Sequence, residues 1–438
     1  MLFERPNSGE RAILVHLDFH SEDEREDSNE FVQLVTSAGG DPVAFITGSR
    51  KRPDARLFVG TGKLEEIREA LIANEGELVL FNHSLSPSQE RNIERELQCR
   101  VLDRTGLILD IFAQRAHTHE GKLQVELAQL QHMSTRLVRG WTHLERQKGG
   151  IGLRGPGESQ LETDRRLLRA RITAIQSRLQ KVRRQREQAR RARRRAEIPA
   201  LSLVGYTNAG KSTLFNVLTT SSVYAADQLF ATLDPTVRRI TVDDVGPVIL
   251  ADTVGFIRHL PHKLVEAFRA TLEEAVIADL LIHVVDCADP ERQDNMKQVM
   301  NVLAEIGAAD IPILEVYNKT DLIGSEPRIE RDEAGQPVRV WLSARDDRGL
   351  DLFYQALSEL LGNEICETSI TLTAAQGRLR ARLFSFDAVL DEEMNDDGSQ
   401  RLKVRLPEAD WQRLLAAESI TEASLDSSRP VSMREEFC

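Results

Sequence analysis

GYTNAGKS, at residues 205–212, matches the pattern G-x4-G-K-[ST]. It follows an apolar run at 201–204 and opens a helix-like run at 213–218, which is the strand–loop–helix context that the pattern requires. In such a loop, backbone N–H groups surround phosphate oxygens, the lysine neutralises phosphate charge, and the last hydroxyl can ligate Mg²⁺. The stretch therefore predicts a nucleoside triphosphate site, formed by Gly205, Tyr206, Thr207, Asn208, Ala209, Gly210, Lys211 and Ser212.

A second motif, at residues 318–321, indicates which base is bound. Asn318, Lys319, Thr320 and Asp321 stand at the end of the apolar run 312–317. A carboxylate at Asp321 can accept hydrogen bonds from guanine N1–H and N2–H₂, two donors that adenine lacks. Charge-assisted bonds are worth roughly 1.5–3 kcal/mol each, so the pair favours guanine strongly. After the next strand-like run come Ser343, Ala344 and Arg345, where a backbone N–H fits the guanine carbonyl.

Two further loops carry groups that can respond to a third phosphate. The first contains Phe230, Ala231, Thr232, Leu233 and Asp234, and the second contains Asp252, Thr253, Val254 and Gly255. A threonine in the first loop can complete a Mg²⁺ shell when the γ-phosphate is present, and Thr232 and Thr236 both qualify chemically. In the second loop, Asp252 would hold Mg²⁺ through water, and the Gly255 N–H would contact the γ-phosphate.

The residue after Gly255 is Phe256, where many GTPases place a water-orienting glutamine. A phenyl ring offers no hydrogen bond to water, so we expect slow hydrolysis by the isolated protein. A partner, a monovalent cation or another residue would supply the missing function, and the sequence does not identify the catalytic group. Asn208 can help to hold K⁺ near the phosphates, or it can serve only as a turn former.

Composition restricts the class of protein. The chain has 438 residues, a net charge of −12, 41% hydrophobic and 29% charged residues, and four cysteines without paired spacing. These values describe a soluble multidomain protein, with neither a disulfide framework nor a zinc site. No apolar run reaches the 18 or so residues of a membrane span, and the N-terminus has no apolar signal core. We therefore expect a cytoplasmic protein, and a monomer.

The pattern of apolar residues predicts four domains. Residues 1–105 alternate strand-like runs (12–17, 43–47, 57–59 and 78–81) with helix-like runs, which indicates a small α/β domain. Residues 106–198 carry two helical stripes separated by the glycine-rich segment 149–157, which predicts a long antiparallel hairpin whose second helix covers 165–195. Residues 199–363 predict a nucleotide-binding domain with a parallel sheet, and residues 364–438 a small α+β appendage.

The second hairpin helix is strongly basic. Residues 165–195 contain thirteen Arg and one Lys against a single acid, Glu187. One interpretation is the solvated face of a coiled coil; the favoured one is an RNA contact, because Arg presents a planar fork to phosphates and stacks on bases. The candidate RNA-binding residues are Lys148, Arg154, Arg183, Arg184, Arg186, Arg190, Arg191, Arg193, Arg194 and Arg195.

Gly60-Thr61-Gly62-Lys63 also lies between a strand-like and a helix-like run. It lacks the first glycine of the phosphate-loop pattern. A plain turn is the favoured interpretation, and a second nucleotide site is the other.

The motifs GYTNAGKS, FATLD, DTVG, NKTD and SAR occur in that order, preceded by DRTGLILDIFAQRA at 103–116 and GGIGLRGPGESQLETDRR at 149–166. In this the chain resembles the HflX family of bacterial GTPases. The resemblance implies Mg²⁺-dependent GTP hydrolysis, binding to the large (50S) ribosomal subunit, and rescue of stalled ribosomes by splitting them, notably under heat stress. It also implies that Ser212 and Thr232 are the Mg²⁺ ligands, that a hydrophobic residue is usual at Phe256, and that the tip 149–157 reaches the peptidyl-transferase region. RNA unwinding and ATP use by the N-terminal domain are themes of the family, but residues 1–105 supply no convincing ATP site.

Alternative functions predict different experimental results. An RNA-binding or RNA-remodelling protein with a mainly structural nucleotide site would show salt-sensitive RNA binding and almost no GTP turnover. An ATPase or small-molecule kinase would not prefer guanine. A tRNA-modification GTPase is disfavoured, since no catalytic cysteine constellation or cofactor loop is found.

Overall fold

The computed structural model describes the backbone of residues 10–19, 27–137, 156–195, 198–219, 229–230, 232–258, 272–362, 365–373, 376–386, 388–395, 399–407, 411, 414–415 and 426–428. The chain divides into two compact units, which are described separately. Unit 1 comprises Met1–Ile240, Pro247–Asp332 and Val338–Leu352, and unit 2 comprises Thr241–Gly246, Glu333–Pro337 and Phe353–Cys438.

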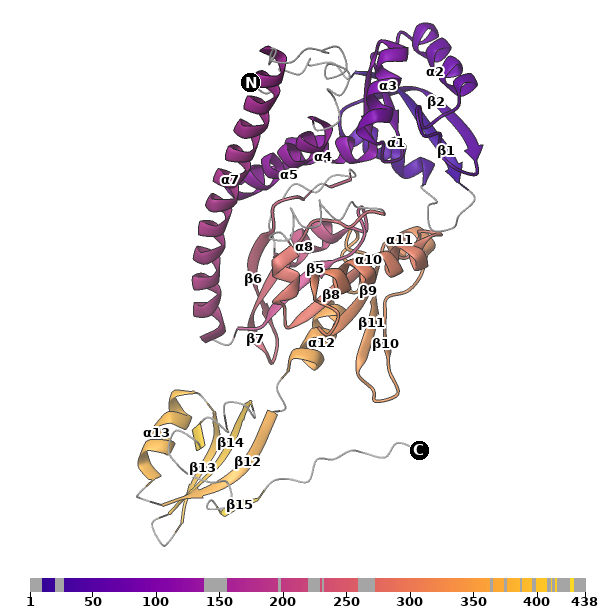
Figure 1. Ribbon diagram of the computed structural model, residues 1–438. Coiled ribbons are helices and arrows are strands. Elements are labelled where there is room, and N and C mark those ends of the chain that lie inside the picture. The colour runs from indigo at the N-terminus through magenta and orange to yellow at the C-terminus, as the bar shows by residue number, and fades with distance from the viewer. Residues whose placement is uncertain are drawn as a thin grey trace. The chain divides into compact units, whose positions relative to one another are not determined.

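The N-terminal part of unit 1 is a parallel sheet with helices packed on it (Figure 1). Its strands are β1 (Arg11–Phe19), β2 (Asp41–Arg50), β3 (Leu78–Phe81) and β4 (Arg100–Asp103), in the order β2-β1-β3-β4, and its helices are α1 (Ser28–Ser37), α2 (Thr61–Ala73) and α3 (Pro87–Leu97). Alternate residues of β1 enter two different cores: Leu14 packs with Phe31 of α1, and Ile13 with Ile67 of α2. Burial on both faces explains the continuous apolar run of this strand.

The strand expected at 57–59 is wrong. Phe58 has a φ of +63° and forms only an isolated bridge with Asp54. The Asp54 carboxylate accepts hydrogen bonds from the backbone N–H groups of Arg56 and Leu57, both at 2.8 Å. A side chain that bonds its own backbone two and three residues onward stabilises a turn, and here this outweighs the apolar composition.

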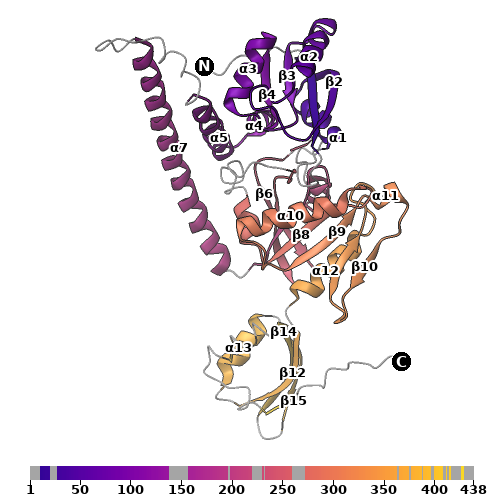
Figure 2. The same cartoon turned by 45° about the vertical axis from the view of Figure 1, so that its right-hand side comes forward.

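In the described residues, three helices follow this sheet. They are α4 (Arg104–Arg115), α5 (His119–Leu137) and α7 (Pro156–Arg195). Leu123 and Leu127 of α5 pack against Ile175 and Leu179 of α7, which are residues of the two predicted stripes. Helix α5 reaches α7 part-way along the length of α7 in both views (Figures 1 and 2). Helix α7 begins at Pro156, inside the predicted tip, because proline is well suited to a first helical turn.

The rest of unit 1 is built on a sheet whose central strands pair in parallel, as predicted. The strands are β5 (Ala200–Val204), β6 (Thr236–Val242), β7 (Gly246–Asp252), β8 (Leu280–Asp286), β9 (Ile313–Asn318), β10 (Arg328–Arg331) and β11 (Pro337–Trp341), in the order β10-β11-β9-β8-β5-β7-β6. The described helices that accompany this sheet are α8 (Lys211–Thr219), α10 (Arg292–Ile306) and α11 (Thr320–Ile323), and α12 (Leu350–Leu361) begins in unit 1 and continues into unit 2. Strand β5 lies between β7 and β8 and pairs in parallel with both, so the loops after these strands gather at one edge.

The described part of unit 2 contains an antiparallel sheet, a helix packed on it and most of α12. Its strands are β12 (Ile365–Leu372), β13 (Val389–Met394), β14 (Gln400–Pro407) and β15 (Asp426–Ser428), in the order β13-β14-β12-β15, and its helix is α13 (Gly377–Ser385). Trp411 is fully buried in the core of this sheet with Leu379 and Leu402. The predicted α+β character is present; β13 was not predicted, because five of its six residues are exposed and its sequence is acidic.

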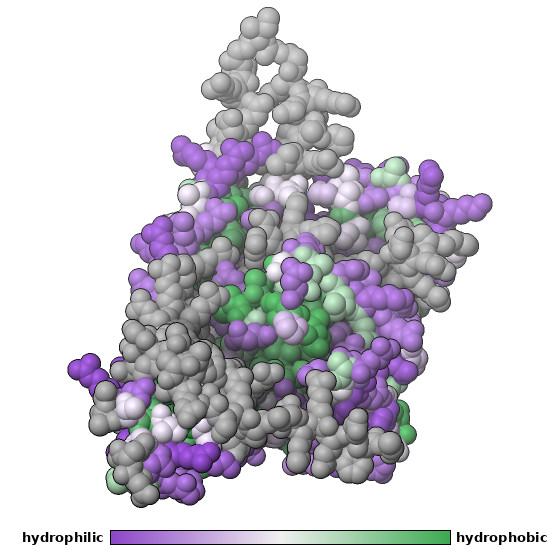
Figure 3. All heavy atoms as spheres, turned by 90° about the horizontal axis from the view of Figure 1, so that it is seen from below, coloured by the Kyte–Doolittle hydropathy of each residue, from purple (hydrophilic) through white to green (hydrophobic). Residues whose placement is uncertain are grey.

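On the face shown in Figure 3 most of the described residues are hydrophilic, and apolar residues gather in one area. Among the described residues, no helix has the length and apolar character needed to cross a membrane.

Candidate nucleotide-binding site

The loop between β5 and α8 has a backbone that its sequence dictates. Gly205 has a φ of +147°, and a Cβ there would lie 2.3 Å from the carbonyl oxygen of Val284, so only glycine fits. Lys211 is 6% exposed, and its ammonium donates to the carbonyls of Gly205 (3.0 Å) and Tyr206 (2.6 Å). Burial lowers the pKa of Lys211 to about 8, although the charge of Asp252 opposes this. The loop thus holds a buried cation where phosphate charge would be neutralised.

Three oxygen-bearing side chains meet beside this lysine. The Ser212 hydroxyl lies 2.7 Å from Asp252 Oδ2 and 2.7 Å from the Thr232 hydroxyl, which itself lies 3.0 Å from Asp252 Oδ2. Asp252 is fully buried, burial raises its pKa, and its Oδ1 has no hydrogen-bond partner among the described residues. Thr236, the other chemically suitable threonine, begins β6. The structure therefore brings together Ser212, Thr232 and Asp252, which come from three separate elements.

The predicted guanine-binding motif, residues 318–321, lies at the end of β9 and is held in place by hydrogen bonds to neighbouring loops. Asn318 donates to the Ala209 carbonyl (2.9 Å) and accepts from the Ala344 N–H (3.0 Å), which joins three loops. Lys319 has a φ of +69° and its ammonium pairs with Asp286 at 2.7 Å. The Ser343 hydroxyl donates to Asp321 Oδ1 at 2.7 Å. Of the remaining predicted residues here, Thr320 and Ala344 are buried and Arg345 is exposed.

The segment after β7 is anchored to the phosphate loop by its backbone. Phe256 donates its N–H to the Gly205 carbonyl (3.1 Å), and its carbonyl accepts from the Thr207 N–H (2.7 Å). The phenyl ring is 1% exposed and packs in the central core. Thr253 and Val254 are also buried, and the Thr253 hydroxyl donates to the Leu203 carbonyl. Gly255 approaches Lys211 so closely that a Cβ would lie 3.0 Å from its ammonium.

Residues that the motifs did not reveal contact the phosphate loop from helix α1 and from the segment after β7. The Tyr206 hydroxyl donates to Glu30 of α1 and accepts from the Arg258 N–H (3.0 Å). Glu30 is also paired with Arg104, whose guanidinium donates to Asn82 at 2.8 Å. Burial and the Glu30 charge raise the pKa of Tyr206, so the phenol stays protonated. Arg104 lies within the DRTG run, but its partner Glu30 is 74 residues away, and no local pattern links them.

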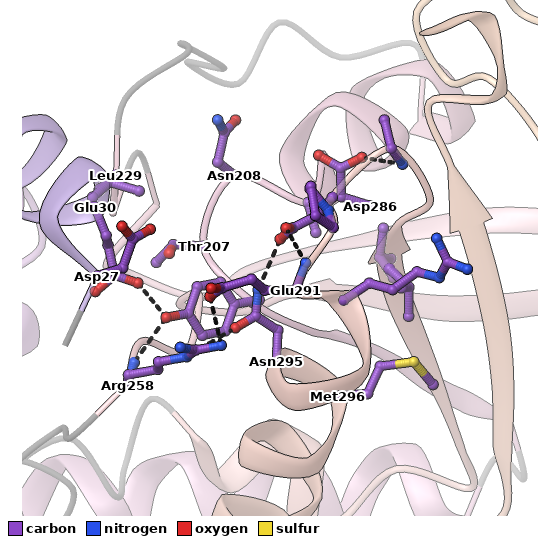
Figure 4. Close-up of a pocket in the computed structure, with 18 of the residues that line it drawn as sticks. Asp27, Glu30, Thr207, Asn208, Leu229, Arg258, Asp286, Glu291, Asn295 and Met296 are labelled. Atoms are coloured by element: carbon purple, nitrogen blue, oxygen red, sulfur yellow. Dashed lines mark hydrogen bonds and ion pairs between the residues drawn. The ribbon is translucent and has the colours of Figure 1, made fainter. Parts of the chain in front are cut away.

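A cavity of about 460 Å³ lies beside this network (Figure 4). It is lined by the start of α1, the phosphate loop and the start of α10. Arg258 pairs with Glu291 (2.9 Å) and bonds Asn295 (3.2 Å) within it. His283 of β8 also lines the cavity; burial, with the Lys211 charge, lowers its pKa to about 4, so it is neutral at pH 7. Asn208, the candidate K⁺ residue, lines the same cavity and has a φ of +60°.

The remaining candidates are placed as follows. Lys148, Arg154 and Ala231 lie outside the described residues. The eight arginines from 183 to 195 that we named lie on α7, and Arg184 is exposed. Lys63 donates to the Thr47 carbonyl (2.8 Å) and pairs with Glu66, which fits a turn-and-helix start.

Comparisons with known proteins identify the family. Three family models match successive regions: "GTP-binding GTPase N-terminal" at 25–113, "GTP-binding GTPase Middle Region" at 115–193 and "50S ribosome-binding GTPase" at 200–319. GTPase HflX of Escherichia coli (strain K12) is 60% identical over 95% of this chain and 98% of its own length. The chain belongs to the HflX family. GTPase HflX of Magnetococcus marinus is 44% identical over 84% of this chain and 85% of its own length. A solved structure, "crystal structure of SsGBP and GDP complex", is 26% identical, with a TM-score of 0.47, over 80% of this chain and 98% of that one.

Membership of the HflX family confirms two predictions. The chain is a GTPase, which converts GTP and water to GDP and phosphate, and its fold is the predicted α/β fold with a P-loop GTPase domain. This finding argues against the ATPase and small-molecule kinase hypotheses.

Proposed function

We propose that this HflX-family GTPase is a Mg²⁺-dependent switch that binds the large (50S) ribosomal subunit and acts in splitting or rescue of ribosomes, especially under stress. In the GTP state the segment around Thr232 would be held at the nucleotide, and the basic helix α7 would contact ribosomal RNA. The observation that carries the proposal is the meeting of Thr232 with Ser212 and Asp252. The description of the family model at 200–319 supports the choice of partner.

The oxygen atoms at the site fit Mg²⁺. Mg²⁺ prefers hard oxygen ligands and keeps several waters, and the unpartnered Oδ1 of buried Asp252 is available to accept a hydrogen bond from such a water. Ser212 and Thr232 would hold the ion directly. When bound, the ion neutralises charge on the outer phosphates. Lys211 and the loop N–H groups bind the same phosphates, while Asn318 and Asp321 orient the base.

The burial of Phe256 supports slow hydrolysis without a partner. Its ring packs in the core, so it cannot orient water, and the group that does so is unassigned. The ribosome, or K⁺ held with the help of Asn208, would supply the missing function.

Co-sedimentation with purified large subunits tests the proposal. We expect the full-length protein to bind with a non-hydrolysable GTP analogue and much less with GDP, and GTP turnover to rise when subunits are added. Turnover is compared in Na⁺ and in K⁺ to test the role of Asn208. Equal absence from the subunit fraction in both nucleotide states would contradict the proposal. Salt-sensitive RNA binding with negligible turnover on ribosomes would favour the RNA-remodelling alternative.

Neutralising part of α7 tests the RNA contact. Replacing Arg190, Arg191, Arg193, Arg194 and Arg195 with Gln should weaken subunit binding and reduce the slope of log K against log salt by about 4, since each phosphate contact contributes about −0.7 to −0.9. GTP affinity should stay unchanged. Replacing Arg328, which lies on β10, is the control. If GTP affinity falls together with subunit binding, the arginines are structural instead.

A further inference from the structure

Asp234 does not face the nucleotide loop; its carboxylate lies at the start of α5. One oxygen accepts hydrogen bonds from the backbone N–H groups of His117 (2.9 Å) and Thr118 (2.8 Å), and the other accepts from the Thr118 hydroxyl. Charge-assisted bonds of this kind are among the stronger hydrogen bonds in proteins. Residues more than 110 positions apart are joined by this one side chain.

The residue that Asp234 binds is the cap of α5. The Thr118 hydroxyl accepts from the Gly121 N–H (3.0 Å), and its carbonyl accepts from the Lys122 N–H (3.0 Å). Gly121 makes room for the carboxylate, because a Cβ there would lie 2.0 Å from Asp234 Oδ1. The helix start is thus shaped around Asp234, and any side chain at position 121 would displace the carboxylate.

On its other side, Asp234 is two residues from Thr232. Leu233, between them, is 1% exposed, and Phe230 packs edge-on against Phe112 of α4 with ring centroids 4.7 Å apart. Leu229 donates its N–H to the Ser37 hydroxyl of α1 at 3.1 Å. Residues 229–230 and 233–234 are therefore held by contacts with α1, α4 and the start of α5, so we expect Thr232 to move only if these contacts break or the start of α5 moves with it.

We propose that Asp234 is a positioning residue, which couples Thr232 at the nucleotide to the start of α5 and through it to α7. Because α5 packs along α7, the nucleotide state would reach the basic helix by this route. Coupling between two sites is reciprocal, so a partner that engages α5 or α7 would in turn fix Thr232 in place. The inference rests on the proposed contact of Thr232 with Mg²⁺, but it does not depend on the identity of the partner.

Two variants of the full-length protein test it from opposite sides. Asp234→Ala removes the acceptor of all three hydrogen bonds at the start of α5. Gly121→Ala removes no polar atom and favours helix formation, but it occupies the space of the carboxylate. Both should lower affinity for a non-hydrolysable GTP analogue by about tenfold, within the usual range of coupling between sites, and leave GDP affinity unchanged. Both should also abolish the nucleotide-dependent difference in amide hydrogen exchange of α5. Gly62→Ala in α2, where nothing lies within 4 Å of the new Cβ, is the control.

The outcomes separate this inference from the proposed function. Unchanged affinity ratios and exchange differences in both variants would overturn it. Equal losses for the GTP analogue and GDP would also overturn it, because they would indicate a purely structural role. Thr232→Ala is measured in parallel: if it loses discrimination between the nucleotides while the Asp234 and Gly121 variants keep it, only the coupling fails. If Thr232→Ala keeps discrimination, the proposed Mg²⁺ contact fails as well.

Discussion

Asp321→Asn is expected to lower affinity for GTP and GDP by at least about a hundredfold. Two charge-assisted hydrogen bonds of roughly 1.5–3 kcal/mol each depend on the carboxylate. The side chain is held in place by the Ser343 hydroxyl, so it cannot turn away to relieve a mismatch. In the variant, an amide N–H₂ would face a guanine donor, and a buried donor would be left without an acceptor. Calorimetric titration of both nucleotides measures the loss.

A change of base should restore part of the affinity. Xanthine carries a carbonyl oxygen where guanine carries its exocyclic amine, so the new amide can donate to it. We therefore expect Asp321→Asn to prefer xanthosine nucleotides over guanosine nucleotides, reversing the wild-type order. Asp294→Asn, at an exposed position on α10, should leave both affinities unchanged. If the variant loses affinity equally for guanosine and xanthosine nucleotides, Asp321 stabilises the loop and does not contact the base.

The parts of the site that could be predicted from the sequence are those in which a few adjacent residues supply all the groups that bind the ligand. The phosphate loop and the NKTD motif each combine a required backbone conformation with the side chain that uses it, as Gly205 and Lys211 show. Parallel strands then bring their loops to one edge, so the order of motifs along the chain was enough to assemble them. The GTPase activity could be predicted for the same reason.

What could not be predicted depends on pairs that are distant in sequence. Glu30 and Tyr206 meet only after two separate sheets pack together, and each residue alone is unremarkable in its local run. Asp234 belonged to a recognised motif, yet its partner Thr118 lies in a different part of the chain. Among the elements, the run at 57–59 failed as a strand because Asp54 stabilises a turn there.

Lys211→Met should abolish GTP binding and, at the same time, stabilise the nucleotide-free protein by roughly 2–3 kcal/mol. The pKa of Lys211 is lowered from 10.5 to about 8 by burial, so at neutral pH the folded protein holds a charge that would be better solvated in the unfolded chain. The carbonyls that it contacts keep other donors: Gly205 accepts from Phe256, and Tyr206 from Ala209. Removal of the ammonium therefore leaves neither of these two carbonyls without a partner.

The lowered pKa of Lys211 also predicts how the stability of the nucleotide-free protein changes with pH. Between pH 8 and 10.5 the unfolded chain binds more protons at Lys211 than the folded chain, so wild-type stability should gain from this residue as pH rises through that window. The same gain should be absent in Lys211→Met, and Lys297→Met, at an exposed position on α10, should keep it. Urea unfolding of the nucleotide-free proteins at pH 7.5 and 9.5 compares them. A methionine variant that is less stable than wild type at both pH values would contradict the prediction. In that case the two hydrogen bonds of the ammonium to the carbonyls of the loop would stabilise the fold by more than burial of its charge destabilises it.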